Sequence, residues 1–178
     1  MSHTPRDASS WELLRHNLGG SFIARARGLL AMEFVLLGPA GKEFGRLRLG
    51  VTSGAEFRSG NHVVTFETSE RRYRMVAEGS EVLIAGPKGP SIDELEISCG
   101  GQTYEAQISF LRNFAVASYP GGERVVRLLG GLAGRSYEAR FAAEEGGALP
   151  VAVFLLWHVA TNRRRAFRAN SLLKGGDA

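Results

Sequence analysis

The segment that most constrains this fold is 149–160, an apolar run near the C-terminus that is followed at once by an arginine-rich stretch. The run lacks the alternation of a strand, so we interpret 149–168 as a helix, with Pro150 at a first-turn position where its missing N–H is not needed. A helix without a polar face must be enclosed by protein or lie in lipid. The run is shorter than the roughly 20 residues of a membrane-spanning helix, so we expect no transmembrane span. The residues expected inside the protein are Val151, Val153, Phe154, Leu155, Leu156 and Trp157.

The chain before this helix consists of short alternating segments separated by glycine and proline turns, and it draws on most of the 23 glycines. In 43–49, for example, Phe44, Leu47 and Leu49 are apolar while two arginines between them point the other way. Similar segments include 92–98 and 104–111. Such spacing is typical of a sandwich or barrel. We therefore predict a mainly β protein, a closed antiparallel β-barrel of about 10–12 strands that encloses the hydrophobic C-terminal α-helix.

A chain of 178 residues is expected to form one domain with a full core. We expect a flexible leader over 1–9, the barrel domain over 10–170 and a flexible tail over 171–178. The start of the domain, 10–16, fits either a short helix or an opening strand.

Composition excludes several function classes. The net charge of +4 is spread evenly over the two halves of the chain, and the arginines lack interleaved aromatic residues, so we expect no nucleic-acid partner. The single Cys99 and the polar N-terminus, which lacks a signal sequence, favour a cytoplasmic protein. The four histidines have no metal-ligand spacing, and no catalytic motif is present, so we expect no metal, no cofactor and no enzymatic activity.

Arginine clusters are the candidate binding residues. One cluster follows the apolar run, where its charge also complements the negative end of the helix dipole. The others are i, i+2 pairs, and each pair shares one face of its strand. These strand arginines can bind phosphate or can pair with Glu43, Glu67 and Glu70. The candidate ligand-binding residues are Arg163, Arg164, Arg165, Arg168, Arg46, Arg48, Arg72 and Arg74.

Short antiparallel segments over 22–142, closed by the apolar helix that begins near Ala148, resemble the tubby-like superfamily. That superfamily includes the LURP-one-related proteins and the phospholipid scramblases. The resemblance implies a barrel of about twelve strands around a central hydrophobic helix. This chain lacks the cysteine-rich and proline-rich segments of scramblases, and no motif matches the phosphoinositide pocket of tubby proteins.

We therefore expect a non-enzymatic binding or adaptor module of tubby-like type, which contacts an anionic membrane surface or another phosphate-bearing ligand through its arginine faces. The alternative is a small-molecule carrier, a barrel with an apolar internal cavity beside the helix. A solid core around Trp157 would argue against the carrier.

Overall fold

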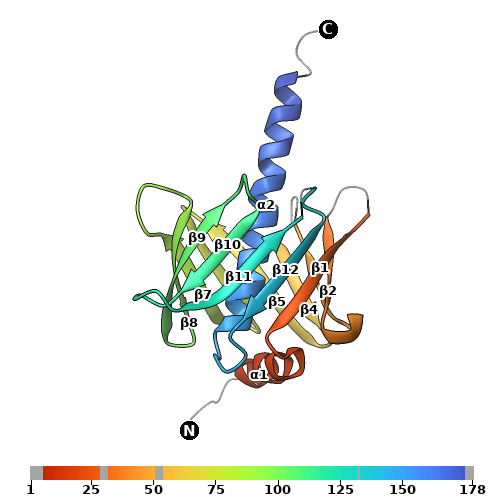
Figure 1. The fold of residues 1–178 in the computed structure, drawn as a ribbon, viewed down its shortest axis with the longest axis vertical. Coiled ribbons are helices and arrows are strands. Elements are labelled where there is room, and N and C mark those ends of the chain that lie inside the picture. The colour runs from red at the N-terminus through yellow and green to blue at the C-terminus, as the bar shows by residue number, and fades with distance from the viewer. Residues whose placement is uncertain (1–5, 29–31, 51–53, 132, 175–178) are drawn as a thin grey trace.

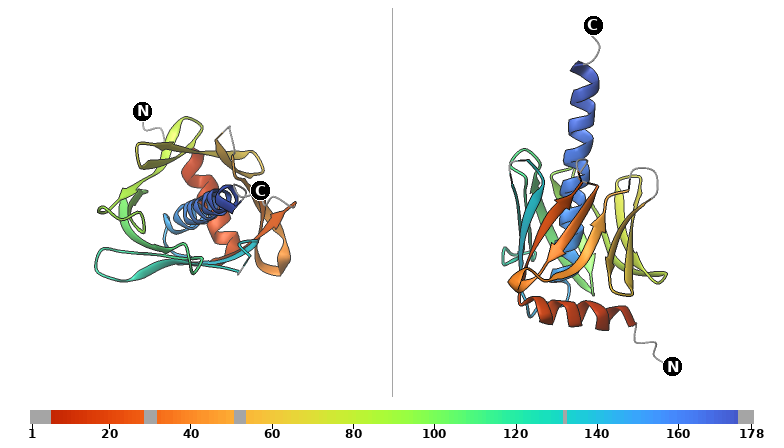
Figure 2. Two further views of the ribbon diagram at one scale, coloured as in Figure 1. Left: turned by 90° about the horizontal axis from the view of Figure 1, so that it is seen from above. Right: turned by 90° about the vertical axis from the view of Figure 1, so that its right-hand side faces the viewer.

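The structure is a computed structural model that describes residues 6–28, 32–50, 54–131 and 133–174, with side chains described between 10 and 166. A wall of strands surrounds one long helix, and a shorter helix lies across one end of the wall (Figure 1). Seen from above, α2 (Ala148–Lys174) passes through the middle of the ring of strands (Figure 2). The prediction of a mainly β protein with an enclosed C-terminal helix is confirmed.

Twelve antiparallel strands form a closed barrel in sequence order, and β1 pairs with β12 to complete it. In that closing pair Ser21 lies opposite Arg140 and Arg25 lies opposite Ser136. A short 3₁₀ turn, η1 (Pro39–Gly41), connects β2 and β3. The strands are β1 (Ser21–Arg27), β2 (Glu33–Leu37), β3 (Glu43–Arg48), β4 (Ala55–Ser59), β5 (His62–Ser69), β6 (Arg72–Ala77), β7 (Ser80–Pro87), β8 (Glu94–Cys99), β9 (Gln102–Ser109), β10 (Phe114–Ser118), β11 (Arg124–Gly130) and β12 (Ser136–Phe141).

The alternation in the sequence sets which side chains face the helix. In β8 the side chains of Leu95, Ile97 and Cys99 are buried while the residues between them are exposed. Successive side chains of a strand point to opposite faces, so one slip in register would exchange the core and solvent sets. Several boundaries differ from the sequence prediction. In particular, β9 ends at Ser109 and β8 begins at Glu94, so 110–111 and 92–93 belong to loops.

The central helix is longer than predicted. Its first 13 residues, 148–160, are all buried, and the Trp157 ring stacks on Phe66 with centroids 4.8 Å apart. At 27 residues the helix is about 40 Å long, whereas an eight-residue strand spans about 27 Å. Its C-terminal part therefore projects beyond the barrel (Figures 1 and 2). The helix continues to Lys174, inside the stretch for which a tail was expected, and the side chains of 167–174 lie outside the described part.

The shorter helix, α1 (Arg6–Leu18), lies across the opposite end of the barrel (Figure 2). It settles the open choice between helix and strand for 10–16, and it begins inside the stretch expected to be a leader. Trp11 is the main anchor: its ring stacks on Phe57 at 5.4 Å and meets the ring edge of His62 at 5.1 Å. Burial of such an aromatic side chain is the main force that holds α1 on the barrel.

The barrel thus has two distinct ends. We call the end from which α2 emerges the helix-exit end; its described connecting residues are 28, 32, 49–50, 54, 70–71, 88–93, 110–113, 131 and 133–135. The α1-covered end consists of α1 and the connections 38–42, 60–61, 78–79, 100–101, 119–123 and 142–147.

Candidate functional site

The four candidate arginines on the strands lie on the outer wall, as their alternation predicted. Two of the four are engaged in ion pairs. Arg46 Nε lies 2.6 Å from Glu43 Oε1, and this hydrogen bond holds the pKa of Glu43 below its ordinary value. Arg74 Nε lies 3.0 Å from Glu81 Oε2 and Arg74 Nη1 lies 3.6 Å from Glu67 Oε2. Exposed pairs of this kind contribute little to stability. These ion pairs do weaken the attraction of the two guanidinium groups for an external anion.

The two wall pairs do not merge into one stripe. Arg46 and Arg48 lie on β3, whereas Arg72 and Arg74 lie on β6. Two strands separate β3 from β6, so the pairs are about 14 Å apart along the wall. In the described part of the chain Arg48 and Arg72 are exposed and make no ion pair.

The helix arginines lie at the helix-exit end. Arg163 is half-buried, and its Nη1 donates a hydrogen bond of 3.4 Å to the carbonyl oxygen of Phe110 in the β9–β10 connection. Arg164 is half-buried and Arg165 is exposed, while the Arg168 side chain lies outside the described part. The structure therefore brings Arg163, Arg164 and Arg165 to one end of the barrel, apart from the wall arginines.

Charge separates the two ends of the molecule. Among the described side chains, seven basic and two acidic residues lie in the connections and the emerging helix at the helix-exit end: Arg71, Lys88, Arg112, Arg135, Arg163, Arg164 and Arg165 against Glu70 and Asp93. At the α1-covered end the balance is reversed, with two basic and five acidic residues: Arg15 and Lys42 against Glu12, Glu78, Glu123, Glu144 and Glu145. One of the basic residues at the exit end, Lys88, pairs with Glu105 at 2.7 Å on the neighbouring wall. The helix-exit end is the more positive end even without it.

Two large apolar side chains stand in solvent at this same positive end. Leu111, in the β9–β10 connection, is 98% exposed, and Ile92, in the β7–β8 connection, is 51% exposed. Sequence reasoning missed both, because it placed them at the ends of strands. Arg112 and Arg71 were missed as well, since nothing in the sequence separates a loop arginine at one end from one at the other.

The barrel interior around Trp157 is packed. Trp157 contacts Tyr73 and Phe154 with ring centroids 5.9 and 5.7 Å apart. His158 is 2% exposed, and its ring meets Tyr73 at 4.7 Å and Phe154 at 5.8 Å. Burial, and to a smaller degree the charge of Arg165, lowers the pKa of His158 to about 4, so the ring is neutral at physiological pH. This packing favours a solid barrel over an internal carrier cavity.

A polar cluster fixes the start of α2 at the α1-covered end. The Glu145 carboxylate accepts hydrogen bonds from the hydroxyls of Tyr119 and Tyr104, the latter at 2.8 Å. The Tyr119 hydrogen bond, helped by Tyr104, holds the pKa of Glu145 below its ordinary value. Burial and the same carboxylate raise the pKa of Tyr104, and the carboxylate hydrogen bond raises the pKa of Tyr119 to about 12. A carboxylate that accepts from two phenols is a structural support for this end.

No group of three or more histidine, cysteine, aspartate or glutamate side chains in the described part lies close enough to hold a metal ion. Within the same part, no helix has both the length and the apolar character needed to cross a bilayer.

The architecture is that of a closed twelve-stranded antiparallel barrel with a helix through its centre. No protein-family profile matches the chain. No curated protein matches it in sequence. Among solved structures, the X-ray structure of a protein from Arabidopsis thaliana is similar, with a TM-score of 0.55 and 12% sequence identity, over 81% of this chain and 93% of that chain. At this identity the similarity shows the fold alone.

Proposed function

We propose that this protein is a non-enzymatic binding module of tubby-like type that docks its helix-exit end on an anionic phospholipid surface. The observation that carries the proposal is the charge asymmetry between the two ends: basic residues gather at one end, where Leu111 and Ile92 are also exposed, and acidic residues gather at the other. The barrel order and the packed central helix agree with the tubby-like resemblance of the sequence.

The chemistry of the helix-exit end suits a bilayer surface. Lys and Arg near an anionic bilayer contribute about 1 kcal/mol each, so several in one plane give measurable binding. Exposed Leu111 and Ile92 add apolar surface that a bilayer interface can bury, which a soluble phosphate ligand would leave in water. The opposite charge at the α1-covered end orients the molecule, because that end is repelled from the same surface.

The wall arginines have a smaller part in this proposal. Arg46 and Arg74 are paired with glutamates, so their charge is largely cancelled at the surface. Arg48 and Arg72 lie near the helix-exit edge of their strands and extend the positive surface around it. Arg163 to Arg165 lie at its centre, where α2 emerges.

Vesicle co-sedimentation tests the proposal. We expect the protein to sediment with phosphatidylcholine vesicles that contain a fifth phosphatidylserine and not with pure phosphatidylcholine vesicles. Replacing Arg112→Glu and Arg165→Glu together should weaken that binding at least tenfold, because two contacts of about 1 kcal/mol become repulsive. Equal binding to both vesicle types would refute the proposal.

A matched control carries the same change of charge at the other end of the barrel. Arg124 begins β11 and Arg140 lies one residue before the end of β12, and both are exposed and close to the α1-covered end. Replacing both with glutamate should leave vesicle binding nearly unchanged. If this variant loses as much binding as the Arg112 and Arg165 variant, only net charge matters and no particular end docks.

A further inference from the structure

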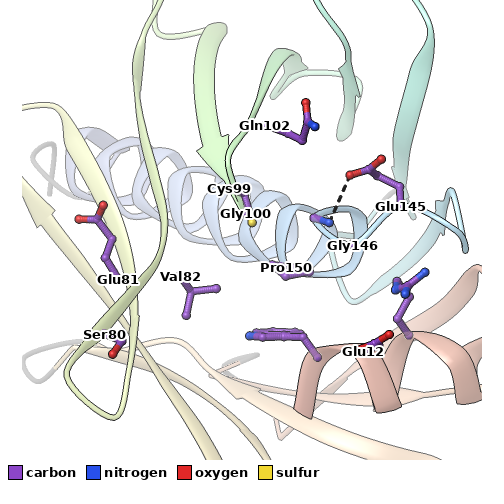
Figure 3. Close-up of a pocket in the computed structure, with 13 residues that line it drawn as sticks. Glu12, Ser80, Glu81, Val82, Cys99, Gly100, Gln102, Glu145, Gly146 and Pro150 are labelled. Carbon is purple, nitrogen blue, oxygen red and sulfur yellow. Dashed lines mark hydrogen bonds between the residues drawn. The ribbon is translucent and has the colours of Figure 1, made fainter. Parts of the chain in front are cut away.

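A pocket of about 560 Å³ lies at the α1-covered end, where four separate parts of the chain meet. Figure 3 shows these parts: Glu12 comes from α1, 80–82 from the start of β7, 99–102 from the β8–β9 turn, and 145–150 from the start of α2. Its volume falls in the range of small-molecule sites, about 300–1,000 Å³. The pocket lies at the opposite end from the proposed membrane contact and is independent of that contact.

Rigid apolar surfaces form much of the pocket lining. Trp11, Val82 and Pro150 contribute side chains, and glycine backbone contributes further surface. Trp11 is 4% exposed and is held in place by its stacking on Phe57. A preformed apolar wall of this kind reduces the ordering cost of binding an apolar molecule.

Two α1 side chains that line the pocket each carry an unsatisfied hydrogen-bond donor. In the described part of the chain, neither the indole Nε1 of Trp11 nor the Nε of Arg15 has a hydrogen-bond partner, although both atoms are buried. The indole N–H is a donor only, so it can be satisfied only by an acceptor. Buried donors are nearly always paired in folded proteins, and an orphan donor beside a pocket indicates where a ligand acceptor belongs.

Two carboxylates of the lining are already engaged. Glu145 accepts from two tyrosines and from the backbone N–H of Gly147, and Glu81 pairs with Arg74. With Glu12, three carboxylates and one guanidinium line the pocket, an excess of negative charge that disfavours an anionic ligand. Because two of the carboxylates have partners, the lining does not require a cation either.

Cys99 also lines the pocket but does not make it a covalent site. Burial, and to a lesser degree the nearby Glu145, raises the pKa of the Cys99 thiol to about 12. The thiolate is the nucleophilic form of cysteine, so this thiol is inert at neutral pH. Binding in this pocket is reversible.

We propose that the pocket under α1 binds a small, uncharged, largely apolar molecule whose oxygen acceptor pairs with the Trp11 indole N–H. The ligand class is an uncharged ring or chain compound with a carbonyl, ether or hydroxyl oxygen. Such a molecule fills the apolar lining, satisfies the orphan donor and avoids the carboxylates.

Titration with Nile red, an uncharged dye with a carbonyl acceptor, tests the pocket. We expect saturable binding at one site and an enhancement of dye fluorescence. The variant Gly146→Leu should reduce the affinity at least tenfold, because Gly146 lines the pocket, lacks a positive φ, and has no atom within 4 Å of an added Cβ. Gly89→Leu is the matched control, since Gly89 has the same open surroundings at the helix-exit end. Equal affinity in wild type and Gly146→Leu, or no saturable binding, would overturn the proposal.

Comparison with pyrene, a hydrocarbon of similar character without an acceptor, tests the role of Trp11. The variant Trp11→Phe keeps an aromatic ring and removes only the N–H donor. We expect it to weaken Nile red binding severalfold and to leave pyrene binding unchanged. If Trp11→Phe weakens the binding of Nile red and pyrene equally, the aromatic ring alone contributes to binding. That result would overturn the pairing of the ligand acceptor with the indole N–H. Thermal unfolding of each variant confirms that the barrel is intact.

Discussion

His158 is the one titratable side chain inside the apolar part of α2, and its ring packs against the aromatic rings of Tyr73, Phe110 and Phe154. The amide of Asn162 lies 3.4 Å from the ring Nε2. Burial disfavours protonation of the ring, and the charge of Arg165 disfavours it further. The histidine is therefore neutral in the folded protein over the whole physiological range.

This burial predicts a pH dependence of stability. The pKa of His158 is about 4 in the folded protein, against about 6.5 when unfolded, so the unfolded chain binds more protons between these values. Stability should fall as pH drops from about 6.5 toward 4, by up to about 3 kcal/mol from this residue alone. Urea unfolding at several pH values should show a flatter profile for His158→Phe than for wild type.

The exposed His16 of α1 supplies the matched control. His16→Phe should retain the wild-type slope between pH 7 and 4, since it leaves the buried His158 in place. A His158→Phe profile that parallels the wild type would show that other groups cause the acid sensitivity.

At the level of elements, Gly147 sets how closely the start of α2 approaches the barrel. A Cβ at this position would lie 3.1 Å from Tyr104 Cζ and still closer to the hydroxyl that bonds to Glu145. Tyr104 is fully buried and cannot move aside easily. Gly147→Ala should therefore lower the free energy of unfolding by about 1–3 kcal/mol, measured by chemical denaturation.

The neighbouring glycine and a double variant make this prediction specific. Gly146→Ala meets no atom within 4 Å and should change stability by less than about 0.5 kcal/mol. Gly147→Ala should cost less in a Tyr104→Phe background, because the clashing hydroxyl is gone. Equal costs in both backgrounds would place the strain elsewhere.

The elements were predictable from the sequence to different degrees. The strands and α2 follow from local patterns: alternation in segments such as β8, and an apolar run without alternation over 149–160. The role of α1 does not follow in this way, because its aromatic anchor, Trp11, is only one apolar residue among several in a short stretch. Its position across the barrel end depends on tertiary contact with Phe57.

The candidate site was predictable only in part. The arginine cluster after the apolar run lies where the sequence placed it, because helix direction and length fix the exit of α2. The pairing of Arg46 with Glu33 depends on the β2–β3 register, and Leu111 was indistinguishable from a strand residue. Which loops share an end depends on counting every strand correctly, since one missed strand exchanges the two ends.

At the scale of the whole molecule, the helix-exit end combines charge and apolar surface, and salt separates the two. Attraction between exposed charges weakens with ionic strength, since the Debye length falls from about 10 Å at 0.1 M to about 3 Å at 1 M salt. Burial of apolar surface does not weaken in this way. Binding to anionic vesicles should therefore fall steeply with sodium chloride and level off at a residual value set by Leu111 and Ile92.

The residual binding at high salt provides the last prediction. Burying a leucine side chain contributes about 2 kcal/mol, so Leu111→Ser should lower vesicle binding at 0.5 M sodium chloride about thirtyfold. At 0.05 M sodium chloride, where the arginines dominate, the same variant should bind almost as well as wild type. Leu13→Ser, at a residue of α1 that is 64% exposed at the opposite end, is the control and should match wild type at both salt concentrations. If Leu111→Ser instead retains the residual binding, the end touches the bilayer through charge alone, without inserting its loops.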